Sequence, residues 1–215
     1  EISAAGKSIY AYDKGSKVAQ AYADFSKEVL AATVCQKTVA LSTVLKEGDA
    51  VSPLTFADEE GRKVYRHTAA HILAQAVKRL YPQAKLTIGP AIENGFYYDF
   101  DSEVTFGPEQ LRALEKEMKK IVSENLRIER FTLPKDEALE LVRKMEEPYK
   151  ELLIERIPEG EEISFYRQGE FTDLCAGPHL FSTAAVRAFR LTACTGAYWE
   201  GNSKNKMLQR IYGTA

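Results

Sequence analysis

The sequence is poor in the residues that carry most protein chemistry and has no long apolar segment. Only three of the 215 residues are histidine, three are cysteine and one is tryptophan. An uninterrupted apolar stretch of about 20 residues, which a transmembrane helix needs, does not occur, so no membrane partner is expected. The cysteines, Cys35, Cys175 and Cys194, are odd in number and far apart. We therefore expect no disulfide framework, and we expect the chain to occupy a reducing, cytoplasmic compartment.

The chain also has no excess of charge of either sign. It contains 29 Lys+Arg against 31 Asp+Glu, a net charge of −2, so contact with nucleic acid would need a local basic patch. Candidates for such a patch are Arg62, Lys63, Arg66, Lys78, Arg79, Lys204, Lys206 and Arg210. Because the chain begins at Glu1 rather than methionine and ends in "MLQRIYGTA" without a polar tail, we expect it to be part of a longer protein.

Residues 1–60 form a first predicted domain. A hairpin-like "ISAAGKSIYAY" and a helix-compatible "SKVAQAYADF" are followed by β-branched runs at 33–41 and 51–56. That order is typical of a ubiquitin-like β-grasp fold. The charged stretch "ADEEGRK" at 57–63 is predicted to be a linker, and the domain boundary is placed near residue 60.

Residues 61–215 form a second, larger predicted domain of the α+β class. A helix is expected from residue 63, with an apolar stripe that includes both histidines, and Pro82 should close it. The stretch "IGPAIENGFYYDF" predicts a hairpin turning at Asn94–Gly95. Amphipathic helices are predicted after Pro108 and in "KDEALELVRKM", and strands in "RIERFTL", "ISFYR" and "AFRLTAC". We expect one antiparallel sheet packed against these helices.

All three histidines lie in two short stretches with matching spacing. His67 and His71 are four positions apart in "RHTAAHIL", and Cys175 and His179 are four apart in "DLCAGPHL". The first pair would share one face of a helix, whereas Gly177–Pro178 predicts a turn between the members of the second pair. Half-buried structural residues would explain any single histidine. The matched pairs favour a site in which the two stretches converge.

Two chemistries remain open for such a site. Three imidazoles and a thiol suit a tetrahedral zinc ion. The spacing of "HTAAH" is that of the H-E-x-x-H zinc proteases, but Thr68 stands where those enzymes carry the glutamate base. Without a metal, the imidazoles can position and deprotonate a water near neutral pH, and an activated ester would be an easy target.

Several longer motifs carry a family resemblance. "RHTAAHIL", "IGPAIENGFYYDF", "DLCAGPHL" and the closing "TGAYWEGNSKNKMLQRIYGTA" closely resemble the editing domain of threonyl-tRNA synthetases, especially the bacterial type, and residues 1–60 resemble the TGS domain that precedes it. The resemblance implies hydrolysis of serine wrongly attached to tRNA(Thr), with threonine spared. It also implies a partner, the acceptor end of tRNA(Thr), and a homodimeric parent enzyme whose absent catalytic domain would use ATP and zinc.

The same resemblance implies the site residues. Catalytic roles fall to His67, His71, Lys150, Cys175 and His179, and substrate-binding roles to Tyr98 and Asp173. His67 would be the base, and Lys150 a second base or a partner for the oxyanion. Cys175 would be a size gate rather than a nucleophile, although a covalent acyl-cysteine stays open. No cofactor is implied for editing, but the alanyl-type relatives bind zinc with such a set, so zinc at His67, His71, Cys175 and His179 stays open. The alternatives are a zinc-holding or tRNA-guiding module and an alanyl-type trans-editing hydrolase.

Overall fold

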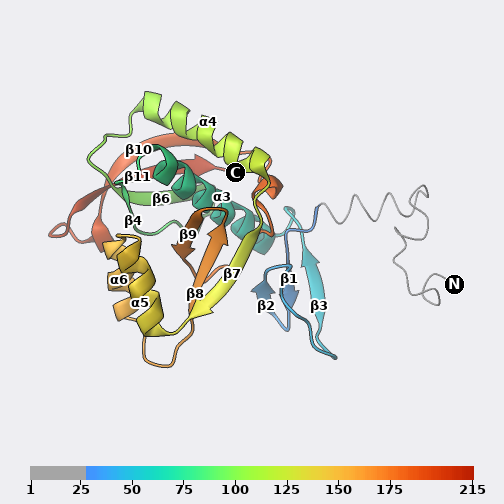
Figure 1. Ribbon diagram of the computed structural model, residues 1–215. Coiled ribbons are helices and arrows are strands. Elements are labelled where there is room, and N and C mark those ends of the chain that lie inside the picture. Colours follow the sequence, from blue (N-terminus) through green and yellow to red (C-terminus); the bar gives the residue numbers. More distant parts are fainter. Residues whose placement is uncertain (1–27) are drawn as a thin grey trace.

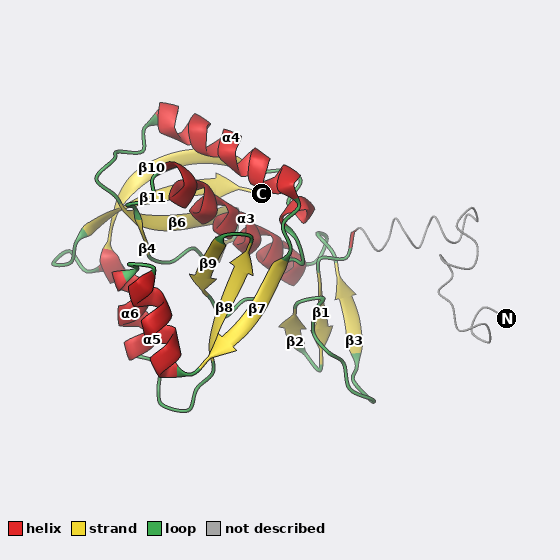
Figure 2. Ribbon diagram, viewed as in Figure 1, coloured by secondary structure: helices red, strands yellow, loops and turns green. Residues whose placement is uncertain are grey.

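The computed structural model describes residues 28–215, and they form an α+β fold with antiparallel sheets (Figures 1 and 2). The fold class is as predicted. The hairpin and helix predicted within residues 1–27 lie outside the described residues. The β-grasp fold and the boundary at residue 60 therefore stay predictions.

A small antiparallel sheet contains the two β-branched runs of the first predicted domain. Strands β1 (Ala31–Val34), β2 (Lys37–Val39) and β3 (Val51–Leu54) lie in the order β2-β1-β3. A two-residue turn joins β1 to β2, and both of its residues, Cys35 and Gln36, have positive φ, as tight hairpins require. Residues on β1 and β3 pack into the same apolar core as the next helix.

Helix α3 (Glu59–Leu80) begins inside the predicted linker, so that prediction is wrong from residue 59 onward. The Asp58 carboxylate accepts the Thr55 N–H at 2.8 Å and fixes the chain just before the helix. Glu59 and Glu60 then occupy the first turn, where negative charge stabilises the positive end of the helix dipole. The run of acids starts a helix instead of separating two domains. The helix ends at Leu80, before Pro82, as predicted.

Helix α3 is buried on all sides, not along one stripe as its sequence suggested. Every residue from 68 to 77 is buried, and several of them are alanine, which lets neighbouring elements approach closely. Gln75 exchanges hydrogen bonds with Gln168 of strand β8 (Ile163–Gln168), while apolar residues of α3 share a core with the aromatic residues of strand β6 (Gly95–Asp101). The helix thus lies between two sheets (Figure 1).

The larger of these two sheets has the order β10-β11-β6-β4, with β5 beside β6. Its other strands are β4 (Lys85–Leu86), β5 (Ala91–Ile92), β10 (Arg190–Tyr198) and β11 (Met207–Thr214). Ile92 pairs with Gly95, so the hairpin turns one residue earlier than predicted. Helix α4 (Pro108–Glu124), which begins at the expected proline, packs on α3 and on this sheet.

The smaller sheet consists of β7 (Ile128–Leu133), β8 and β9 (Phe171–Leu174). Helices α5 (Lys135–Lys144) and α6 (Pro148–Glu155) cover its outer face through a core that includes Val142, Ile154 and Phe165. The structure therefore has two sheets around α3 where one was expected. Two short 3-10 turns, η1 (Thr183–Ala185) and η2 (Trp199–Gly201), complete the fold. Within the described part of the chain, none of the helices has the length and apolar character needed to cross a membrane.

Gly61→Ala tests the fit of α3 against the segment that follows β3. A Cβ at position 61 would overlap the carbonyl oxygen of Thr55. Alanine is the better helix former by about 1 kcal/mol, but we expect the overlap to dominate and to lower the free energy of unfolding in urea by about 1–3 kcal/mol. The exposed substitution Lys119→Ala in α4 is the control and should change stability by less than about 0.5 kcal/mol. A stabilised Gly61→Ala variant would contradict this packing.

Candidate functional site

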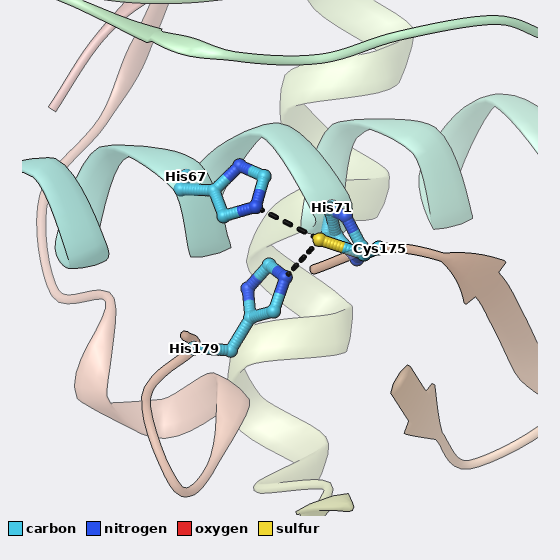
Figure 3. A group of neighbouring side chains, drawn as sticks. All are labelled: His67, His71, Cys175 and His179. Atoms are coloured by element: carbon cyan, nitrogen blue, oxygen red, sulfur yellow. Dashed lines mark hydrogen bonds between the residues drawn. The ribbon is translucent and has the colours of Figure 1, made fainter. Parts of the chain in front are cut away.

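The two pairs singled out in the sequence lie together in the structure. His67 and His71 come from α3, and Cys175 and His179 from the segment after β9 (Figure 3). One ring nitrogen from each histidine and the Cys175 sulfur all lie within 4.8 Å of one another. The turn at Gly177–Pro178 thus brings the second pair against the helix that bears the first.

Cys175 lies between two imidazoles. Its Sγ is 3.0 Å from His67 Nε2 and 3.3 Å from His179 Nε2, and the Gly177 N–H donates to the same sulfur at 3.2 Å. The rings of His67 and His179 stack with centroids 4.3 Å apart. His67 Nδ1 lies 3.1 Å from the carbonyl oxygen of Gly89, which can only accept, so His67 carries its proton on Nδ1 and presents a bare Nε2 to the thiol.

A buried charged cluster adjoins this group on the side of His71. Lys150 of α6 forms an ion pair with Asp173 of β9, with Nζ 2.7 Å from Oδ1. Tyr98 of β6 donates to Asp173 Oδ2 at 2.6 Å, and Lys150 donates to the Tyr98 oxygen at 3.1 Å. His71 Nε2 lies 3.7 Å from Asp173 Oδ2. Every residue named for the site in the sequence therefore belongs to one contiguous cluster.

Gly177 is required where the segment turns. Its φ is +71°, in the left-handed region, and a Cβ there would overlap the Tyr166 side chain. The Tyr166 ring in turn packs edge-on against His179, with centroids 4.5 Å apart. A glycine at this point therefore lets the chain pass over the tyrosine and return His179 to the helix.

Burial keeps the acid–base groups of the site neutral. Loss of hydration lowers the pKa of His67 and lowers those of His71 and His179 well below the ordinary value. The same effect raises the pKa of the Cys175 thiol to about 12. Burial, followed by the charge of Asp173, raises the pKa of Tyr98 well above its usual range. At neutral pH the site thus offers three uncharged imidazoles, a thiol and one internal ion pair.

The site opens to the surface beside His67. A cavity of about 320 Å³ is lined by His67, Gly177 and Pro178, by residues of α3, by Pro90 and Ala91, and by Thr38 of strand β2. His71 and His179 are nearly fully buried, at 3% and 1% exposure, whereas His67 is half-buried. A small group that enters this cavity meets His67 before the other two imidazoles.

Three participants were not expected from the sequence. Thr68 is fully buried and its hydroxyl lies 3.2 Å from His179 Nδ1; the sequence drew attention to it only as the replacement for a protease glutamate. The Gly89 carbonyl and the Tyr166 ring were also missed. Gly89 precedes Pro90 in the stretch "IGPAIENGFYYDF", but no sequence pattern indicates which carbonyl of such a stretch faces a histidine.

The donor set fits a zinc ion. Three ring nitrogens and a sulfur at these separations suit four tetrahedral ligands, and such a fully protein-ligated ion is typical of structural sites. A zinc ion would require the Cys175 thiolate and a bare nitrogen on each imidazole. If it exchanged one ligand for water, it would lower the pKa of that water.

Most basic residues considered for RNA contact are engaged within the protein. Arg79 pairs with Glu117, Glu124 and Glu170. Each of the following also has a partner: Lys63 with Glu59 and Glu60, Lys78 with Glu147, Lys206 with Asp101, Arg210 with Asp99, and Arg62 and Arg66 with main-chain carbonyls. Their first role is structural, and RNA contact by these residues stays a prediction.

Comparison with known proteins finds a family match for one part of the chain and similar ligases for most of it. Residues 163–212, which include Cys175 and His179, match the family described as the threonyl and alanyl tRNA synthetase second additional domain. The chain is 59% identical over 207 residues to a threonine–tRNA ligase of Clostridium tetani. It is 58% identical over 193 residues to that of Acetivibrio thermocellus and 56% identical over 198 residues to that of Caldanaerobacter subterraneus. The chain is homologous to part of these ligases.

The match covers most of this chain but only part of each relative. The alignment to the ligase of Clostridium tetani covers 94% of this chain but 32% of the relative. The chain therefore spans about a third of the length of the threonine–tRNA ligases that it matches. The resemblance of the chain to threonyl-tRNA synthetases is confirmed for this third, and the TGS-like domain at residues 1–60 stays a prediction.

The ion pair between Lys150 and Asp173 predicts a strong double-mutant coupling. Removing one partner leaves an unpaired charge in the interior, so Lys150→Met and Asp173→Asn should each lower the free energy of unfolding by about 3 kcal/mol. The double variant should lose much less than the sum, because it buries no isolated charge. Urea denaturation of all four proteins measures the coupling. Additive losses would show that the two charges do not depend on each other.

Proposed function

We propose that the chain is an aminoacyl-tRNA editing domain that hydrolyses the ester of serine wrongly attached to tRNA(Thr) and spares threonyl-tRNA(Thr). The match to a domain of threonyl and alanyl tRNA synthetases supports an editing role. The observation that carries the proposal is the convergence of three neutral imidazoles beside a cavity of about 320 Å³, which is the size of a small-molecule site.

The need for such a domain follows from the chemistry of the two amino acids. Serine lacks one methyl group of threonine, and a missing methyl contact weakens binding by only about 1–3 kcal/mol. A synthetic site that selects by binding alone would therefore release mischarged tRNA. A second pocket that hydrolyses the seryl ester and excludes the extra methyl group of threonine supplies the missing accuracy.

In this proposal the 3′-terminal adenosine brings the seryl ester to the cavity, and a water attacks the carbonyl. His67 is the general base, because it is the imidazole that lines the cavity and its depressed pKa keeps it neutral and able to accept a proton. Lys150 supplies positive charge for the developing oxyanion. Asp173, with His71 and His179, orients the water and the seryl ammonium and hydroxyl groups.

Residues 1–60 would act as the TGS-like domain and 61–215 as the deacylase. The remaining two thirds of the relatives' length would carry the ligase reaction, with its ATP and zinc, and the dimer contact.

Deacylation of separately prepared Ser-tRNA(Thr) and Thr-tRNA(Thr) by the 215-residue chain tests the proposal. We expect release of serine with little release of threonine, and the same rate after treatment with a chelator. Loss of activity on chelation would favour a zinc-dependent hydrolase. No release from either substrate would favour a zinc-holding or tRNA-guiding module, for which the ligand-like donor set is the supporting observation. Release from mischarged tRNA(Ala) instead would identify an alanyl-type hydrolase.

Cys175→Ala separates a gating thiol from a nucleophilic one. The pKa of Cys175, raised to about 12 by burial, leaves almost no thiolate at pH 7, so we expect the variant to keep serine release within about tenfold of the wild-type rate. Hydrolysis of threonyl-tRNA(Thr) should rise, because removal of the sulfur leaves space beside His67, which lines the cavity. Cys175→Ser, which keeps the volume more nearly constant, is the matched control. Complete loss of activity in the alanine variant, together with a trapped acyl-cysteine in the wild type, would contradict the gating role.

A further inference from the structure

A continuous series of hydrogen bonds runs through the site between two main-chain groups. Its five contacts join Leu180 N to Thr68 Oγ1 (3.1 Å), Thr68 Oγ1 to His179 Nδ1 (3.2 Å), His179 Nε2 to Cys175 Sγ (3.3 Å), Cys175 Sγ to His67 Nε2 (3.0 Å) and His67 Nδ1 to Gly89 O (3.1 Å). The series ties the segment after β9 to α3 and then to the turn before β5. Figure 3 shows its central part, in which both dashed lines meet at Cys175.

The two ends of this series fix its direction. A main-chain N–H can only donate, and a carbonyl oxygen can only accept. Each neutral group between them, a hydroxyl, an imidazole, a thiol and a second imidazole, has only one proton to donate. If every contact is a hydrogen bond, donation therefore runs from Leu180 to Gly89, and His179 and His67 must be opposite tautomers.

We propose that Thr68 is a positioning residue that donates to His179 Nδ1 and thereby places the imidazole proton of His179 on Nε2. His179 then donates to the Cys175 sulfur, and the thiol proton points to His67 Nε2. Thr68 touches neither the cavity nor the sulfur. It acts through the ring of His179.

One competing acceptor has to be weighed. The Thr68 oxygen is also 2.9 Å from the carbonyl of Val64, a common bond for threonine in a helix. If the hydroxyl donated there, His179 would carry its proton on Nδ1 and turn a bare Nε2 toward a sulfur whose proton already serves His67. The interior would then hold an acceptor without a donor, which is costly. When Thr68 donates to His179 instead, the Val64 carbonyl still has a donor, because it accepts the helical N–H of residue 68.

Burial makes the threonine hydroxyl hard to replace. Thr68 is 0% exposed, and His179 and Leu180 are each 1% exposed, so bulk water does not reach Nδ1. The Thr68 hydroxyl also accepts the Leu180 N–H, and its orientation is thereby tied to the backbone that carries His179. Valine, which has the same shape without the oxygen, would fill the space but would lose the hydrogen bonds to His179 and to the Leu180 N–H.

The consequence for catalysis rests on the proposed function. In the resting site the thiol proton occupies the nitrogen of His67 that would act as base, so a water or an ester group must displace that contact before His67 can take its proton. The fixed donor and acceptor roles around the sulfur pre-organise the site for one orientation of the entering group.

Ring-nitrogen NMR of the metal-free chain tests the tautomers without any substrate. With only three histidines in the sequence, the imidazole spectrum contains three rings, and single His→Gln variants assign them. We expect His67 to carry its proton on Nδ1 and His179 on Nε2 at neutral pH. A proton on Nδ1 of His179 would overturn the proposal. The chain must be metal-free because zinc bound to Nε2 of His179 would also leave the ring proton on Nδ1.

A matched pair of variants tests the role of Thr68 itself. In Thr68→Val the Nδ1 resonance of His179 should move to the position of an imidazole nitrogen without a hydrogen bond, and Thr68→Ser should restore it. The valine variant should also lower kcat for deacylation about tenfold with little change in KM, since groups that orient a functional histidine typically contribute this much. An unchanged Nδ1 resonance in Thr68→Val would contradict the proposal. Correct tautomers without deacylation in any protein would instead refute the proposed function alone.

Discussion

The site depends on the burial of one helix between two sheets. Because α3 is enclosed from residue 68 to residue 77, a side chain on it that points away from one sheet still meets the other. His71 is therefore shielded from water, and the Thr68 hydroxyl contacts His179 in the segment after β9. A helix covered on one side only would have left these groups in water, with ordinary pKa values.

The distribution of charge in the interior follows from that enclosure. Moving an ion out of water is unfavourable unless a partner accompanies it, and the site contains one such pair, Lys150 with Asp173, supported by the Tyr98 hydroxyl. All other titratable groups between this pair and the cavity are neutral at pH 7. The site thus combines a fixed ion pair in its interior with one uncharged proton acceptor, His67, at its opening.

Sequence reasoning succeeded where a pattern is local and failed where geometry is set by contacts far along the chain. Spacing located α3, α4 and α5 and identified the two pairs His67/His71 and Cys175/His179, because helical periodicity and turn residues are short-range signals. It missed α6 and β9, which are too short to show a period, and these elements carry Lys150 and Asp173. The run "DEE" was mistaken for a linker because acidic residues suit both a solvated loop and the first turn of a helix.

One residue that lines the cavity, Thr38, comes from strand β2 of the small N-terminal sheet. A molecule bound beside His67 would therefore contact the small N-terminal sheet as well as α3, and its binding free energy would include both contacts. By thermodynamic reciprocity, binding in the cavity would stabilise the contact between the sheet and α3 by the same free energy by which that contact strengthens binding. The strength of the contact between the small sheet and α3 would therefore contribute to the affinity and the residence time of any molecule bound in the cavity.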